Sequence, residues 1–360
     1  MRLLFYCQHS VGLGHLMRSY ALCERLAERF RVVLLCGGQL PEGIEPPRNV
    51  ELIPLPPLGV KPGEGFGSGD PRYTTARAWE VRRQRIMAAL READPAVVLV
   101  ELFPFGRAKF ARELVPLLEA ARARGAFTAC SLRDILVSSR EDQRAFDDRA
   151  RALADAHLDA VLVHCDPRFA RLEETFKPTR PLAVPVYYTG FVAGRDPEPA
   201  QREDHIVVSA GGGRVGASLM RDAMAASNGR PMRVIAGPLM PEHEWRELQA
   251  AAPANVELVR SVGDLAGELA RAAASISQCG YNTALDLIRT RVPALVVPYA
   301  TPSEDEQTRR ARRLEQLGVV QVATHLNGHL PHLLEFQPAP AALDLDGAAR
   351  TAELLWELAT

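Results

Sequence analysis

Short continuous runs of apolar residues alternate along this chain with longer segments in which apolar residues recur at helical spacing. Such apolar runs predict strands that are covered on both faces, as in a parallel sheet. In the first half we expect strands at residues 2–7, 32–35, 96–100, 127–131 and 160–164, with helices such as 16–30 and 74–92 between them. This strand–helix alternation predicts a doubly wound α/β sheet.

The alternation resumes after residues 192–204, a polar and proline-rich stretch that is typical of a domain linker. Further strands are expected at residues 205–209, 233–236, 256–259, 273–277, 294–298 and 319–323. The length of 360 residues exceeds that of most single cores. We therefore predict two Rossmann-like domains, at residues 1–191 and 205–344, and expect the C-terminal helix within 345–360 to pack back on the first domain.

Residues 54–71 depart from this pattern because they are rich in proline and glycine. Their composition predicts a long irregular loop, and loops of that length inside a compact domain are usually functional or disordered. We expect this loop, together with residues 101–107, to influence which molecules the protein binds.

Composition argues against a nucleic-acid-binding, membrane-spanning or secreted protein. The chain is 47% hydrophobic and 24% charged, with a net charge of −1, so nothing in its electrostatics favours nucleic acid as a partner. The chain lacks an apolar stretch long enough to span a membrane, and its N-terminus lacks signal-peptide features. We expect a cytoplasmic protein with six scattered cysteines as buried thiols. Peripheral membrane association and the oligomeric state stay open.

Residues 273–307 carry the pattern expected of a phosphate-binding site. A short apolar run is followed by a glycine-containing turn and a helix start, where backbone N–H groups and the helix dipole favour phosphate. A carboxylate on this helix could reach a ribose hydroxyl. We assign to a nucleotide-sugar site Gln278, Gly280, Tyr281, Asn282, Thr283, Asp286, Glu306 and Gln307. The structural alternative is a capping box at Thr283 and Asp286 and a plain helix start at Glu306 and Gln307.

Two further glycine-containing turns follow predicted strands. Gly12 and Gly14 do not complete the dinucleotide fingerprint, because Met17 occupies the third glycine position. The triplet Gly211, Gly212 and Gly213 could let the backbone approach a ligand closely, or could form a flexible turn.

Polar side chains also lie at the predicted ligand edge of the first sheet. His15 stands where a strand gives way to a helix, and could be a helix-start hydrogen bonder or a base. Arg18, one turn later, could hold an anion or face solvent. Glu101 ends another buried strand and is hard to explain by packing, whereas Phe103 and Phe105 can simply cap the core.

These features resemble the two-domain GT-B glycosyltransferases, in which two doubly wound Rossmann-like domains face each other across a cleft. The resemblance is to the glycosyltransferase family 28 branch, typified by the peptidoglycan N-acetylglucosaminyltransferase of the MurG type, and more narrowly to a bacterial group of predicted glycosyltransferases. It covers nearly the whole chain. The motifs that carry it are GLGHLMRS, ELFPFGR, SLRDIL, VSAGGG, SQCGYNT and EDEQTRRA.

The resemblance implies a site for a nucleotide diphosphate, most simply UDP, on the second domain. By position, Ser261 and Val262 would lie by the base and Asp286 by the ribose. The helix start from Gly280 to Thr283 would hold phosphate, and Glu306 and Gln307 the donor sugar. Gly12, Gly14 and His15 match the loop that faces the donor. Glu306 replaces a glutamine of the family, and Gly-Gly-Gly replaces Gly-Gly-Ser. The lipid acceptor of the peptidoglycan enzyme is not carried over.

The implied activity is a metal-independent, inverting hexosyl transfer from a UDP-sugar to a small-molecule or glycan acceptor, without a cofactor. His15 or Glu101 would act as the base, and a histidine supplies a pKa near the working pH without special tuning. The sequence contains no Asp-x-Asp triplet of the metal-dependent kind. A UDP-sugar hydrolase of the pseudaminic-acid-pathway type and a non-catalytic nucleotide-sugar-binding protein are the alternatives.

Overall fold

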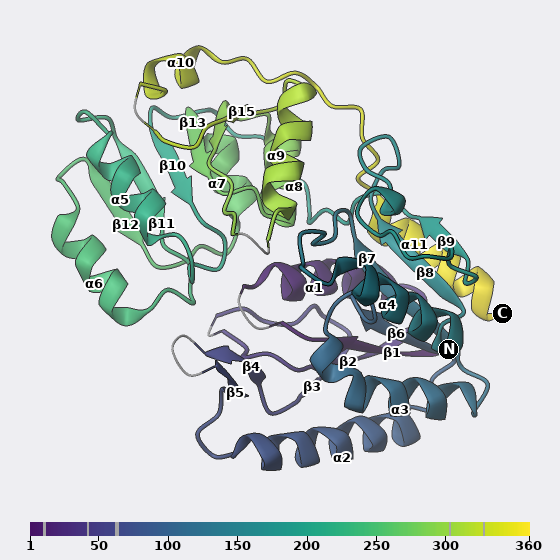
Figure 1. The fold of residues 1–360 in the computed structure, drawn as a ribbon. Coiled ribbons are helices and arrows are strands. Elements are labelled where there is room, and N and C mark those ends of the chain that lie inside the picture. Colours follow the sequence, from purple (N-terminus) through teal and green to yellow (C-terminus); the bar gives the residue numbers. More distant parts are fainter. Residues whose placement is uncertain (10–11, 42, 62–64, 302–303, 327) are drawn as a thin grey trace. The chain divides into compact units, whose positions relative to one another are not determined.

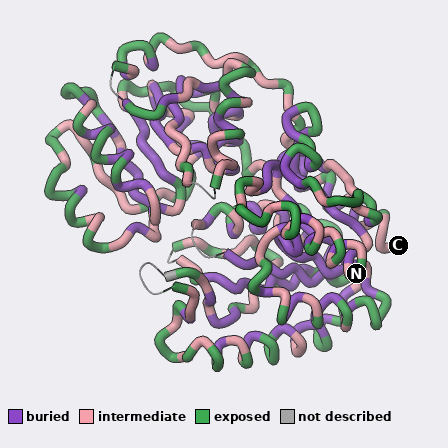
Figure 2. The backbone as a smooth tube through the Cα atoms, in the orientation of Figure 1, coloured by how far each residue is buried: buried purple, intermediate pink, exposed green. Residues whose placement is uncertain are grey.

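The computed structural model describes residues 1–9, 12–41, 43–61, 65–301, 304–326 and 328–360. The chain forms two compact units, labelled by element in Figure 1. The first comprises Met1–Leu40, Glu45–Ala193 and Leu343–Thr360, and the second Pro41–Ile44 and Gly194–Ala342. Most of the stretch that we predicted as a linker therefore belongs to the second unit. In each unit the buried residues follow the strands, as Figure 2 shows in purple.

The first unit contains a seven-stranded parallel sheet in the order β3-β2-β1-β6-β7-β8-β9. Its strands are β1 (Arg2–Cys7), β2 (Arg31–Cys36), β3 (Val50–Pro54), β6 (Val97–Glu101), β7 (Phe127–Arg133), β8 (Ala160–His164) and β9 (Val186–Tyr188). The central strands are buried along almost their whole length, because helices cover both faces. The strand order reverses between β1 and β6, so the loops that follow these two strands meet at one point of the sheet edge.

The helices of the first unit include one from the C-terminal end of the chain. They are α1 (Gly14–Leu26), α2 (Thr75–Ala93), α3 (Ala111–Arg122), α4 (Gln143–His157) and α11 (Gly347–Ala359), with short 3₁₀ turns η1 (Ala108–Phe110) and η2 (Leu172–Glu174). α11 packs against α1. Next to α1, the rings of Phe30 and Trp356 meet edge to face at 5.5 Å. α1 ends at Leu26, one turn earlier than we expected.

The region expected to be an irregular loop, residues 54–71, instead contains an antiparallel hairpin. Its strands are β4 (Leu58–Lys61) and β5 (Gly65–Ser68). Leu58 and Ser68 pair at its base, and both are buried. The backbone carbonyl of Leu58 accepts a hydrogen bond of 2.9 Å from the side chain of Gln8. The hairpin is thus attached to the segment that follows β1.

The second unit repeats the same plan with a six-stranded parallel sheet in the order β12-β11-β10-β13-β14-β15. Its strands are β10 (Ile206–Ser209), β11 (Met232–Ile235), β12 (Val256–Val259), β13 (Ala274–Ser277), β14 (Ala294–Val296) and β15 (Gln321–Val322). Its helices are α5 (Ala217–Ala225), α6 (Glu242–Ala251), α7 (Leu265–Arg271), α8 (Tyr281–Thr290), α9 (Glu306–Gln316) and α10 (Leu330–Glu335). The order reverses between β10 and β13. The doubly wound α/β class is therefore confirmed in both units.

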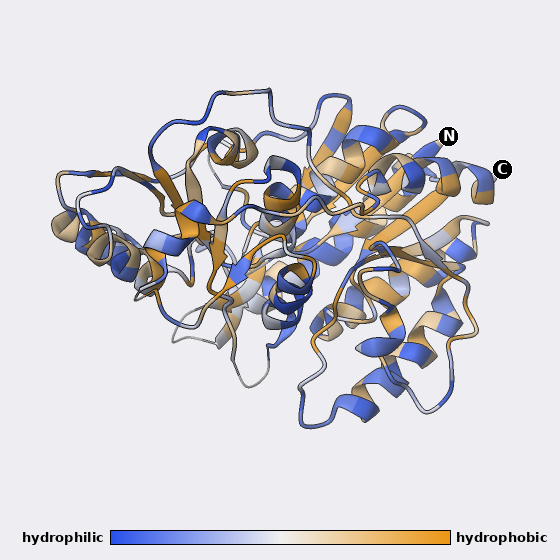
Figure 3. Cartoon of the chain, turned by 90° about the horizontal axis from the view of Figure 1, so that it is seen from above, coloured by the Kyte–Doolittle hydropathy of each residue, from blue (hydrophilic) through white to orange (hydrophobic). Residues whose placement is uncertain are grey.

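Hydropathy follows this layering, with apolar strands and helices that are polar on their outer sides, as Figure 3 shows. All six cysteines are buried free thiols, as predicted. Within the described ranges, no helix combines the length and apolar character needed to cross a bilayer.

Candidate functional site

The reversal point of the first sheet brings together the two residues that we predicted as alternative bases. β1 and β6 are parallel neighbours, with Tyr6 opposite Val100, so α1 begins above the end of β6. His15 is the second residue of α1, and Glu101 is the last residue of β6. His15 Nδ1 lies 2.6 Å from Glu101 Oε1. A carboxylate can only accept, so Nδ1 carries the proton and Nε2 the lone pair of a neutral ring.

Glu101 is held as a carboxylate. Burial raises its pKa, but His15, Arg18 and Arg107 together bring the pKa well below the usual range. Arg18 Nη2 donates to the same Oε1 at 2.5 Å and is itself almost fully buried. The alternative in which Arg18 faces solvent is therefore wrong. A carboxylate with a low pKa that is engaged in this way suits orientation of a histidine better than abstraction of a proton.

His15 is mostly buried, and its basicity differs from that of an untuned histidine. Burial lowers the pKa of His15 to about 3, with the Glu101 carboxylate opposing and Arg107 and Arg133 adding to the decrease. The expectation of a pKa near the working pH is thus wrong for this structure. The ring is neutral at pH 7. Phe103 and Phe105 are buried and cap the core, as expected.

In the second unit, the loop between β13 and α8 ends at a glycine, Gly280, that has free space beside it. The N-cap of α8 is Gly280, with no side-chain capping bond, and Thr283 is the third helical residue. The capping box proposed for Thr283 and Asp286 is therefore wrong, and Asp286 is the sixth residue of the helix instead of lying in its first turn. No described atom outside the adjoining residues lies within 4 Å of the position that a Cβ of Gly280 would occupy. This helix start leaves room for a ligand.

The same loop is held from α9. Gln307 Oε1 accepts hydrogen bonds from the backbone N–H groups of Cys279, at 3.0 Å, and Tyr299, at 3.1 Å. Arg310, which is buried, donates to the carbonyl oxygen of Cys279 at 2.8 Å. Sequence reasoning missed Arg310. Its signal is helical spacing, since it lies three residues after Gln307 and so on the same face of α9.

The glycine triplet after β10 has a packing explanation. Gly213 has φ +88°, and a Cβ there would lie 2.4 Å from the carbonyl oxygen of Ala236. Gly237, with φ +93°, approaches Gly213 in return. The Gly212 carbonyl accepts from the N–H of Leu239, so the turn is tied to its neighbour. Gly211 also has a left-handed φ, of +59°, and nothing described lies within 4 Å of its missing Cβ.

Some of the remaining candidate residues are hydrogen-bonded to the loop between β13 and α8 or lie at a helix start, and others, in the portion of the chain that is described, are not joined to these residues. Gln278 Nε2 donates to the carbonyl oxygen of Val215, which links the β13 loop to the glycine-rich turn. Asn282 lies in the first turn of α8 and Glu306 starts α9. Ser261 and Val262 follow β12, an edge strand. Among the described residues no hydrogen bond joins them to the other candidates. In the first unit, Gly12 precedes α1 and Gly14 begins it.

Asp286 is mostly buried, and its carboxylate accepts a hydrogen bond of 2.6 Å from Arg289. Burial raises the pKa of Asp286 to about 6, against the opposing effect of Arg289. Arg289 also donates to the backbone carbonyls of Gly194 and Arg195. The candidate ribose ligand is thus oriented by a side chain that is fixed to the start of the second unit.

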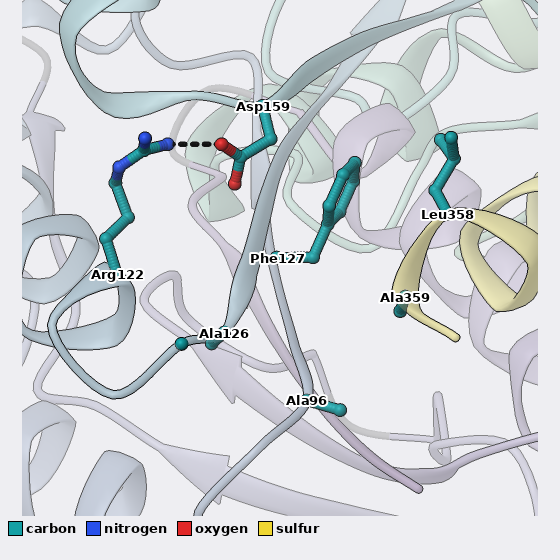
Figure 4. A pocket seen from close by; sticks show the side chains of 8 residues that line it. Ala96, Arg122, Ala126, Phe127, Asp159, Leu358 and Ala359 are labelled. Carbon is teal, nitrogen blue, oxygen red and sulfur yellow. Dashed lines mark hydrogen bonds and ion pairs between the residues drawn. The ribbon is translucent and has the colours of Figure 1, made fainter.

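A hollow of about 430 Å³ lies at the opposite, amino-terminal edge of the first sheet. Its polar side chains, Arg122 and Asp159, pair with each other at 2.5 Å, as Figure 4 shows. Asp159 also accepts from the N–H of Thr128 at 2.8 Å. The two polar side chains of the hollow are therefore engaged with each other. In the described part of the chain, no three or more His, Cys, Asp or Glu side chains are placed to hold a metal ion.

No protein-family model matches the chain, and no curated protein sequence matches it. Solved structures do. MurG of Acinetobacter baumannii superposes with a TM-score of 0.59 at 16% identity, covering 99% of this chain and 100% of its own. The chain has the GT-B fold.

Two further GT-B structures extend this comparison. Phytolacca americana UGT2, complexed with UDP-2-fluoro-glucose and pterostilbene, gives a TM-score of 0.56 at 16% identity, over 100% of this chain and 94% of its own. The glycosyltransferase VinC in complex with dTDP gives 0.56 at 15% identity, over 100% and 95%. At these identities the likeness establishes the fold, and the chemistry has to be argued from the residues.

Proposed function

We propose that this protein is a glycosyltransferase that moves a sugar from a nucleotide-diphosphate sugar, most simply a UDP-sugar, to a hydroxyl acceptor. The observation that carries the proposal is the neutral His15 held by Glu101 at the reversal point of a GT-B unit. Structures of the same fold with a UDP-sugar analogue and with dTDP support a nucleotide-sugar donor. The sequence motifs and the likeness to MurG favour the family 28 branch.

In the proposed reaction, His15 Nε2 takes the proton of the acceptor hydroxyl as that oxygen attacks the anomeric carbon. The bond from the anomeric carbon to the diphosphate breaks, UDP leaves with the bonding electrons, and the configuration inverts. Glu101 keeps the ring in the required tautomer and stabilises the imidazolium that forms. The two candidate bases therefore have different roles: His15 accepts the proton, and Glu101 orients the imidazole ring.

The second unit would bind the donor. The start of α8 would receive the diphosphate, where backbone N–H groups and the helix dipole stabilise the charge of the leaving group. Asp286 would bind the ribose. The Oε1 atom of Gln307 is already engaged by the backbone, so its amide N–H groups are the part that would meet the donor sugar. Glu306 would accept from a sugar hydroxyl, and Ser261 with Val262 would lie by the base.

Calorimetric titration with UDP tests the donor site. We expect UDP to bind in preference to GDP and dTDP, and Asp286→Asn to weaken UDP binding by about tenfold or more, because a charged hydrogen-bond acceptor is lost. Asp222→Asn, at an exposed position of α5, is the matched control and should bind UDP normally. Failure of every nucleoside diphosphate to bind would overturn the proposal.

The affinity for the donor should also depend on pH through Asp286. Its pKa of about 6 is above the usual value, so the carboxylate becomes protonated as the pH falls through 6. UDP-glucose is a suitable ligand because its diphosphate is doubly esterified and does not titrate there. We expect its affinity to fall between about pH 7 and about pH 5 in the wild type and to stay flat in Asp286→Asn. Equal profiles for the two proteins would contradict the assignment.

A further inference from the structure

The loop after β6 places a second arginine beside the candidate base. Arg107 Nε lies 3.8 Å from Glu101 Oε2, which is too long for a hydrogen bond. Within the described part of the chain, Nε and Nη2 of Arg107 are buried and make no hydrogen bond, and neither does Glu101 Oε2. The Arg107 side chain is only 16% exposed. Two nitrogens of this guanidinium are therefore withdrawn from water without the hydrogen bonds that usually compensate.

The backbone of this loop is also conformationally strained. Arg107 has φ +58° and ψ +27°, in the left-handed region that non-glycine residues rarely occupy, and Leu102 has φ +65°. Strain of this kind persists where the surrounding structure imposes it, and it concentrates at binding and active sites. Backbone strain and unsatisfied donors coincide at Arg107.

Around Glu101, two arginine side chains face one carboxylate. Arg18 and Arg107 both lie against the single carboxylate of Glu101, and Arg18 has the short contact. His15 is neutral and adds no charge. An anion next to His15 would compensate the positive charge of Arg107.

We propose that Arg107 binds an anionic group of the acceptor, a phosphate or a carboxylate, and thereby holds the acceptor hydroxyl within reach of His15. The planar guanidinium fork matches the two oxygens of such a group. The acceptor part of this inference rests on the proposed transferase function. The same chemistry could come from the donor diphosphate, and the experiment separates the two sources.

The test uses inorganic phosphate as the probe and the ring signals of His15 as the reporter. NMR spectra of full-length protein labelled at histidine are recorded during a phosphate titration, and His15 is assigned by the signal that disappears in His15→Ala. In the wild type and in the exposed control Arg83→Gln we expect a saturable shift of this signal. In Arg107→Gln the dissociation constant for phosphate should rise by about tenfold or more, and in Arg107→Lys by less, because lysine keeps the charge but not the fork.

A repeat at saturating UDP decides the source of the anion. Persistence of the phosphate effect on His15 supports an acceptor site, whereas its elimination by UDP would assign Arg107 to the donor diphosphate and overturn the proposal. An unchanged titration in Arg107→Gln, or no effect in the wild type, would also overturn it. If UDP fails to bind but phosphate still acts through Arg107, the proposed function fails and the anion site stands.

Thermal unfolding distinguishes binding from a merely structural role. Arg18 keeps the short ion pair with Glu101 when Arg107 is replaced, so Arg107→Gln should unfold at nearly the same temperature as the wild type. Phosphate should raise the unfolding temperature of the wild type more than that of the variant. A clear decrease in the unfolding temperature of Arg107→Gln, with phosphate protection retained, would show that Arg107 serves the fold.

Discussion

Replacing His15 with alanine is expected to lower sugar transfer by about 100- to 10,000-fold while leaving the affinity for UDP unchanged. The reason is that His15, at the reversal point of the first sheet, combines a ring lone pair with a carboxylate partner. The donor site proposed in the second unit contains no atom of His15. A loss of transfer without a loss of UDP binding would therefore locate the base.

The measurement is UDP release from a panel of UDP-sugars, with hydroxyl acceptors that include phosphorylated and carboxylated compounds. His243→Ala, at an exposed position of α6, is the matched control. Glu101→Gln should also slow transfer, since Arg18 would lose its charged partner and the ring its carboxylate. Full transfer in His15→Ala would eliminate His15 as the base. UDP release that needs no acceptor in the wild type would instead indicate a hydrolase.

The pH profile of the same reaction carries a further signature of His15. A histidine with its ordinary pKa would lose its base form below about pH 6.5. Burial lowers the pKa of His15 to about 3, so the neutral ring persists at lower pH. Transfer at saturating donor should therefore not fall through pH 6.5 on account of His15. The use of saturating donor keeps the titration of Asp286 from contributing.

The strands were the part of the fold that sequence predicted best. The bounds of β1 and β8 coincide with the runs from which they were predicted, because strands covered on both faces are apolar at nearly every position. The bounds of β12 also coincide, although this edge strand is only partly buried and contains Glu257. The hairpin of β4 and β5 was missed because its glycines conceal any alternation. The hairpin is stabilised by the pairing of its strands and by the hydrogen bond from Gln8 to the Leu58 carbonyl. Neither contact can be predicted from local composition.

The candidate site was predictable as a set of residues but not as a set of contacts. Sequence placed His15 and Glu101 at the same sheet edge, yet their hydrogen bond joins positions 86 residues apart and depends on β1 and β6 being neighbours. The low pKa of His15 is a consequence of burial, which only the folded chain provides. The unsatisfied donors of Arg107 occur at a residue with a left-handed backbone, which the sequence pattern did not predict.

The second large effect is expected on stability, at Arg82. This side chain is fully buried and ion-pairs with Glu113 through Nε, at 3.1 Å, and Nη2, at 2.6 Å. It also donates to Tyr6 and Gln8, each at 2.8 Å, and to the carbonyls of the loops after β2 and β3. Tyr6 donates in turn to Glu113, at 2.5 Å. One guanidinium thus joins α2, α3, β1 and two loops.

Arg82→Met should lower the free energy of unfolding of the first unit by about 3–5 kcal/mol, because the Glu113 carboxylate would stay buried without its cation. The neighbouring Arg83→Met, on the exposed side of α2, should change it by less than about 0.5 kcal/mol. Urea unfolding in a Trp245→Phe background reports on this unit, since the remaining tryptophans, Trp79 and Trp356, both belong to it.

The double variant Arg82→Met with Glu113→Leu separates an uncompensated charge from lost packing. If the unpaired carboxylate causes the destabilisation, removing it should recover much of the lost stability, since apolar residues often replace a buried ion pair at little cost. Equal stability of the single and double variants would assign the effect to the bonds with the loops instead. Gln8 directly follows β1, so the same network also holds the first residue after that strand.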